Sequence, residues 1–136
     1  MTEFETVDID DNICQFQYVK EINDLDNEVT FKVYSIPINE IRWFSYRVKI
    51  INENLVKSEH LSINNHTEFS KKGIPEKIIE IASSELNRDI YSSPISFNEG
   101  DFLTPQSKKV WERLVAQNEN AVLDSENDCF IYKRTD

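Results

Sequence analysis

The sequence predicts an α+β domain with a strand meander in its first half, then two main helices and a C-terminal β-hairpin. Up to Ile63, apolar residues alternate with polar ones, which is typical of half-buried strands. From Gly73 onward, apolar residues recur at helical spacing instead. The chain has 136 residues without a repeat, linker or low-complexity tract, so we expect one core and a single domain over residues 1–136.

The meander is predicted from four runs rich in aromatic and β-branched residues. Polar turn clusters such as Asn23–Asn27 and Asn52–Asn54 separate some of these runs, and links this short favour antiparallel pairing. Residues 1–11 are strongly acidic, and we expect a flexible N-terminus there. A helix on one face would have to cover the meander. The expected strands are Gln15–Lys20, Val29–Ile36, Phe44–Ile50 and Leu55–Ile63.

The second half begins with a helix at Ile74, where Pro75 suits the first turn because its missing amide hydrogen would have had no intrahelical acceptor. A short strand, Asp89–Ser92, and a loop, Phe97–Leu103, follow. Thr104 then caps a second helix that has Pro105 in its first turn. Finally, Ala121–Leu123 and Cys129–Tyr132 are the arms of the terminal hairpin.

The net charge argues against nucleic acid as a partner. The formal net charge is −10, and such a surface repels the phosphate backbone of nucleic acids. It suits a cationic amine or a basic protein instead. The acidic first residues and the lack of an apolar run of about 18 residues predict a cytoplasmic chain outside the membrane. Cys14 and Cys129 are expected to be buried thiols, and the spacing of Cys and His predicts no metal site.

The segment LSINNHTEFSKKGIPEKIIEIASSELNRDIYSS carries the functional signal. It predicts a strand, a basic turn with a glycine, a helix and a second strand. A helix N-terminus offers unpaired amide hydrogens and partial positive charge, and glycine lets the backbone approach a phosphate closely. Lys71 and Lys72 add cations just before Gly73. A solvated glycine turn without a ligand is the alternative interpretation.

In this segment and in the helix and hairpin after it, the chain resembles the GNAT superfamily of acyltransferases, from about Leu55 to Tyr132. The resemblance implies acetyl-CoA as cofactor, bound on the strand, the turn and the following helix. Applied to this sequence, it implies cofactor contacts at Lys71, Lys72, Gly73, Ile74, Glu76 and Ser92. It also implies that the strand at Asp89–Ser92 parts from its neighbour and opens a slot for the thioester.

Three residues depart from the family pattern. Ser70 stands where the family has Gln or Arg, and Pro75 stands where it has Gly or Ala, which removes one amide donor. Trp111 occupies the position where many members carry a tyrosine that protonates the leaving thiolate. Tyr91 is the candidate for an alternative acid, and Glu59 is the candidate base. His60 is a second possible base, but in a regular strand it would face away from Glu59.

Two functions follow from these observations. The first is an acyl-CoA-dependent N-acetyltransferase of GNAT type that acts on an amine. The second is a non-catalytic GNAT-like interaction or regulatory domain that has lost efficient acyl-CoA binding, as Ser70, Pro75 and Trp111 would favour.

Overall fold

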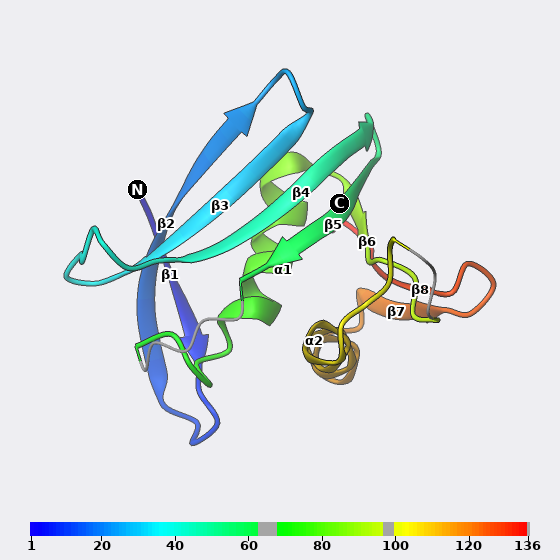
Figure 1. The fold of residues 1–136 in the computed structure, drawn as a ribbon. Coiled ribbons are helices and arrows are strands. Elements are labelled where there is room, and N and C mark those ends of the chain that lie inside the picture. The colour runs from blue at the N-terminus through cyan, green and yellow to red at the C-terminus, as the bar shows by residue number, and fades with distance from the viewer. Residues whose placement is uncertain (63–67, 97–99, 136) are drawn as a thin grey trace.

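The computed structural model describes residues 1–62, 68–96 and 100–135, which form one mixed, mainly antiparallel sheet and two helices (Figure 1). The predicted α+β class is therefore confirmed. The sheet has eight strands in the order β1-β2-β3-β4-β5-β6-β8-β7. The elements are β1 (Thr2–Val7), β2 (Ile13–Asn23), β3 (Glu28–Ser35), β4 (Phe44–Asn52), β5 (Leu55–Leu61), α1 (Ile74–Leu86), β6 (Asp89–Tyr91), α2 (Pro105–Gln117), β7 (Ala121–Asp124) and β8 (Cys129–Tyr132).

Strands β1 to β5 form the predicted antiparallel meander, in which each strand pairs with the next one along the chain. The period-two alternation matches burial: Val29, Phe31 and Val33 of β3 are at most 1% exposed, whereas the residues between them are partly exposed. Helix α1 lies behind these strands in Figure 1 and covers one face of the sheet. Its fully buried side chains are Ile74, Ile78, Ile79 and Ala82.

The N-terminal residues differ from the expected flexible segment. Thr2–Val7 form β1, which pairs along its whole length with the start of β2. The ring of Phe4 contacts those of Phe16 and Tyr18, with centroids 6.1 and 5.8 Å apart. The acidic side chains Glu3 and Glu5 are exposed between the inward-facing residues. This strand matters for the site because its end reaches the start of α1.

The C-terminal elements continue the sheet beyond β5. Strand β6 pairs with β5 in parallel, and β8 then pairs antiparallel with both β6 and β7. Helix α2 packs against β7 and α1. Its buried Trp111 stacks on Phe130 of β8, with ring centroids 6.0 Å apart and an interplanar angle of 11°. The predicted second helix and terminal hairpin are confirmed.

Candidate functional site

The turn before α1 is shaped by a glycine that no other residue could replace without strain. Gly73 is the N-cap of the helix, with a φ of 78°. A Cβ at this position would lie 2.8 Å from the carbonyl oxygen of Val7. Both the positive φ and this close approach require glycine. The sequence signal at Gly73 therefore has a structural cause: the end of β1 lies directly against the start of α1.

The first turn of α1 lacks a side-chain cap. No side chain among the described residues forms a capping hydrogen bond at Gly73, and Pro75 has no amide hydrogen to offer. The positive end of the helix dipole is therefore not neutralised by a cap. Glu76 is the acidic residue of this turn, and its 7% exposed side chain accepts a hydrogen bond of 2.6 Å from Nε of Arg113 on α2.

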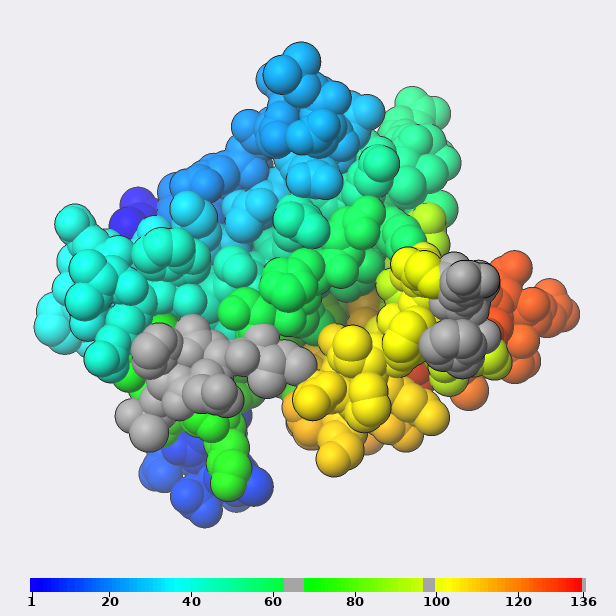
Figure 2. All heavy atoms as spheres, in the orientation of Figure 1, coloured from blue at the N-terminus to red at the C-terminus, as the bar shows by residue number. Residues whose placement is uncertain are grey.

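A groove of about 770 Å³ lies between the end of β1, the start of α1 and one face of α2. In Figure 2 it is visible as a notch between the green residues before α1 and the yellow-orange residues of α2. Helix α2 lines it with residues three or four positions apart, as expected of one helical face. These are Gln106, Ser107, Lys109, Val110, Arg113, Leu114 and Gln117.

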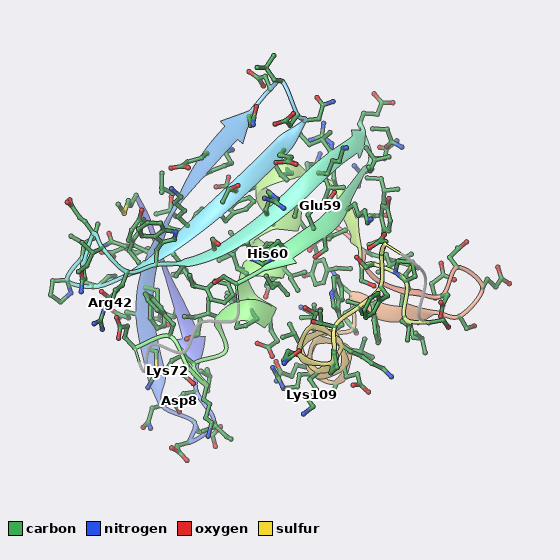
Figure 3. The ribbon with its side chains drawn as sticks, in the orientation of Figure 1. Asp8, Arg42, Glu59, His60, Lys72 and Lys109 are labelled. Carbon is green, nitrogen blue, oxygen red and sulfur yellow. The ribbon has the colours of Figure 1, made fainter. Side chains whose placement is uncertain are left out.

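The groove gathers cations in a chain of negative net charge. Arg113 forms an ion pair with Glu76, and Nζ of Lys77 lies 3.5 Å from Oε2 of Glu80. By contrast, Lys71, Lys72 and Lys109 also line the groove and form no hydrogen bond or ion pair with any described residue. Figure 3 shows Lys72 and Lys109 on opposite sides of the groove. Such an arrangement attracts an anion from two walls.

Asp8, in the turn after β1, also lines the groove and lies near Lys72 in Figure 3. Its Oδ1 accepts hydrogen bonds of 2.9 Å from the amides of Asp10 and Asn12. The amide of Asn12, with a smaller effect from the charge of Lys72, holds the pKa of Asp8 below its usual value of 3.8. Asp8 therefore remains charged at neutral pH and competes with any anionic ligand for Lys72.

A second hollow, of about 310 Å³, adjoins the groove where β5 and β6 part. The parallel pairing runs from Leu55 and Asp89 to Lys57 and Tyr91, where β6 ends, while β5 continues to Leu61. Hydroxyl and aromatic side chains of the loop after β6 and of α2 line this hollow together with the second half of β5. Leu61, Gln106 and Ser107 line both the groove and the hollow, so the two are adjacent.

A β-bulge at Glu59 changes the expectation for the two candidate bases. Val48 pairs with Ser58 and Arg47 with His60, which leaves Glu59 without a partner on β4. A bulge breaks the strict alternation of side chains. Glu59 and His60 consequently both line the second hollow, and both are exposed (Figure 3). The expectation that His60 faces away from Glu59 is therefore wrong, because it assumed a regular strand.

The other predicted residues fall outside the two hollows or serve the fold. Ile74 is fully buried in the core. The hydroxyl of Ser92 donates to the carbonyl of Ser93 and accepts from the amide of Phe130, which ties the end of β6 to β8. Tyr91 is half-buried beside Lys57 and lines neither hollow. Trp111 does border the second hollow, although it is 0% exposed. Ile63, the predicted end of the fourth strand, and Phe97, the predicted start of the loop, lie outside the described residues.

Several residues that line the groove could not be recognised from the sequence as site residues. Thr6 and Asp8 belong to a segment that looked like a flexible acidic end, and Lys109 and Arg113 looked like the solvent side of a helix. The spacing of Lys109 and Arg113, four residues apart on α2, could have placed them on one face. Nothing in the sequence indicates which element that face meets.

Comparison with known proteins gives no match to a family model, to a curated protein or to a solved structure. Within the described ranges, no helix is long and apolar enough to cross a membrane. The same residues contain no cluster of three or more His, Cys, Asp or Glu side chains that could hold a metal ion.

Proposed function

We propose that this chain is an acyl-CoA-dependent N-acetyltransferase of GNAT type acting on an amine. The observation that carries the proposal is that the groove and the second hollow lie side by side and share Leu61, Gln106 and Ser107. One lies at the uncapped start of α1 with three unpaired lysines, and the other lies where β5 and β6 part beside Glu59. This arrangement suits a long ligand with an anionic end and a reactive end.

In this proposal the diphosphate of acetyl-CoA lies against Gly73, Lys71 and Lys72. The pantetheine arm passes Leu61, Gln106 and Ser107, and the thioester lies in the second hollow. Glu59, directly or through water, takes a proton from the ammonium group of the acceptor. The amine nitrogen then forms a bond to the acetyl carbon and the carbon–sulfur bond breaks. The second proton that the nitrogen loses on becoming an amide passes through solvent to the leaving thiolate.

The acceptor is proposed to be a cationic amine. Glu59 is the only carboxylate among the described residues that line the second hollow, and no Lys or Arg is among them. His60 is the other ionisable side chain there. Such a lining favours an acceptor with an ammonium group and without a carboxylate of its own.

The proposal predicts that acetyl-CoA raises the thermal midpoint of unfolding. A ligand at 100 times its Kd adds about 2.7 kcal/mol, which is roughly 5–10 °C for a domain of this size. The double variant K71E/K72E should abolish most of this rise because it reverses two charges at the diphosphate. The double variant K20E/K49E, at exposed sites on β2 and β4, is the control because it changes the net charge by the same amount. An unchanged midpoint with millimolar acetyl-CoA would sink the proposal.

Substitution of Gly73 is a poorer test of cofactor binding. Any side chain there would meet the Val7 carbonyl and strain a backbone with positive φ. Loss of ligand binding in such a variant would not be distinguishable from a damaged turn.

The second candidate function is a non-catalytic GNAT-like domain, acting on a basic protein partner or in regulation. Two observations favour it: Pro75 removes an amide at the cofactor turn, and Trp111 is buried against Phe130 with no proton to give at neutral pH. Turnover separates the two functions. Release of free CoA thiol from acetyl-CoA in the presence of a panel of amines supports the enzyme, and binding of acetyl-CoA without turnover supports the second candidate.

A further inference from the structure

The site proposed for the diphosphate has an unusual shortage of donors. Pro75 occupies the first turn of α1, so one amide hydrogen that a helix start normally offers is missing. Glu76, next along the chain, brings a carboxylate to the same turn, although Arg113 is paired with it. A diphosphate bound here would need another donor nearby to replace the lost amide.

Thr6 of β1 has a hydroxyl group that forms no hydrogen bond with any residue that the structure describes. The side chain is 5% exposed, and its Oγ1 is buried without a hydrogen-bond partner. Buried hydroxyl groups in proteins are nearly always hydrogen-bonded, so an unused one calls for an explanation. Thr6 lies opposite Cys14 of β2 in the sheet, and that pairing satisfies backbone groups only.

The position of Thr6 links this unused hydroxyl to the start of α1. A Cβ built on Gly73 would lie 3.7 Å from the Cβ of Thr6, so the two residues are neighbours. Thr6 lines the same groove as Lys71 and Lys72. The start of α1 therefore combines three features. It has no side-chain cap, the turn before it brings two unpaired lysines, and β1 brings the unused hydroxyl.

We propose that the Thr6 hydroxyl donates a hydrogen bond to the diphosphate of the bound acyl-CoA and replaces the amide that Pro75 lacks. This inference rests on the proposed function and adds β1 to the cofactor site. Because Oγ1 is covered in the ligand-free chain, contact with the diphosphate requires the groups around Thr6 to adjust as the ligand enters. Side-chain and loop adjustments of this kind are common on ligand binding.

The test uses Thr6→Val, which replaces the hydroxyl with a methyl group of similar size, and Thr6→Ser, which keeps the hydroxyl. Isothermal titration of the whole chain with acetyl-CoA and, separately, with inorganic diphosphate measures both affinities. Thr6→Val should weaken both ligands about tenfold, the size expected for a hydrogen bond to a charged group. Thr6→Ser should stay within about twofold of the parent chain.

A ligand-free melt separates this role from a structural one. Removing an unused buried hydroxyl is neutral or stabilising, so Thr6→Val should melt at or above the midpoint of the parent chain while binding more weakly. A lower midpoint that accompanies the weaker binding would mean that Thr6 supports the fold, and the inference would be overturned.

The two ligands also separate this inference from the proposed function. If Thr6→Val binds diphosphate as tightly as the parent chain does, the inference about Thr6 is wrong whatever happens with acetyl-CoA. If the parent chain binds diphosphate in a Thr6-dependent way but does not bind acetyl-CoA, Thr6 belongs to an anion site for another ligand, and the proposed function fails together with the assignment of that site to acyl-CoA. If the parent chain binds neither ligand, both fail.

Discussion

At the scale of single residues, Glu59 owes its position to an irregularity of β5. The residue has no partner on β4, because Ser58 and His60 pair with consecutive residues of that strand. The bulge brings Glu59 and His60 into one hollow, where a base and a second polar group can act on the same substrate. Neither residue is buried, so both are open to solvent and to an acceptor.

We predict that Glu59→Gln lowers kcat/KM for acetyl transfer about 100-fold, the contribution typical of a general base. The amide has the same shape but cannot take the proton of the acceptor ammonium. The thermal shift produced by acetyl-CoA should be retained, since Glu59 lies outside the groove. Glu53→Gln, at an exposed turn residue, is the control. Full activity in Glu59→Gln would remove this residue as the base.

The bulge also shows where prediction from the sequence stops at this scale. Glu59 could be chosen as a candidate because it is a carboxylate on a strand before a basic turn. The segment Ser58–Glu59–His60 is polar throughout, however, and contains no apolar residue whose side would reveal a break in the alternation. The joint orientation of Glu59 and His60 therefore depends on pairing with β4, which the local sequence does not encode.

At the scale of elements, an ion pair ties the loop after β6 to β5. Lys57 of β5 donates a hydrogen bond of 2.5 Å to Asp101, and the two side chains are 20% and 40% exposed. Burial opposes the charge of Lys57, but the hydrogen bond and charge of Asp101 outweigh it and raise the pKa of Lys57. Burial likewise opposes the charge of Asp101, but hydrogen bonds from Lys57 and Ser93 outweigh burial and lower the pKa of Asp101. The pair thus holds one border of the second hollow.

We predict that Lys57→Met lowers the free energy of unfolding by about 0.5–1 kcal/mol at neutral pH, a value discounted for the exposure of the pair. The lowered pKa of Asp101 contributes stability above its ordinary pKa of 3.8, and this is lost as pH falls through the lowered value. The raised pKa of Lys57 contributes stability below 10.5, and this is lost as pH rises through the raised value.

Urea unfolding of the two chains at several pH values checks this prediction. The difference between them should be constant from about pH 4 to pH 10 and should shrink outside that window. Lys49→Met, at an exposed lysine of β4 that forms no ion pair within the described part of the chain, controls for the change of side chain. A difference that does not depend on pH would mean that packing of the Lys57 stem, rather than its charge, stabilises the loop.

Elements differ in how far the sequence could predict them. The alternation in β3 and β4 and the helical spacing from Ile74 reflect burial on one side only, so those elements were predictable. Strand β1 was not, because a single aromatic residue, Phe4, faces inward among exposed carboxylates. Its pairing with β2 and the ring contacts of Phe4 order a segment whose composition resembles that of a solvated end.

At the scale of the whole molecule, the groove depends on elements that are far apart in the sequence. The end of β1, the start of α1 and one face of α2 meet there, and the ion pair between Arg113 and Glu76 links the two helices. Residue patterns predicted the turn at Gly73 but not its surroundings. Those surroundings arise from the fold of the whole sheet: three strands separate β1 from β5, yet Val7 of β1 and Leu61 of β5 line the same groove.

The net charge of −10 repels a polyanion such as acetyl-CoA from the molecule as a whole. Only the local cations of the groove can attract it. Lys108 and Lys109 are neighbours on α2 and both are exposed, but only Lys109 lines the groove. Either change to Gln alters the net charge equally. We therefore predict that Lys109→Gln weakens acetyl-CoA binding about fivefold, whereas Lys108→Gln changes it by less than about twofold.

Ionic strength distinguishes this local attraction from the field of the whole protein. The Debye length falls from about 10 Å at 0.1 M salt to about 3 Å at 1 M, so long-range repulsion disappears first while a direct contact weakens less. Titration with acetyl-CoA at both salt concentrations should show that the difference between Lys109→Gln and Lys108→Gln shrinks but persists at 1 M. Equal effects of the two variants at low salt would mean that only total charge matters, and the groove between α1 and α2 would not be where the cofactor binds.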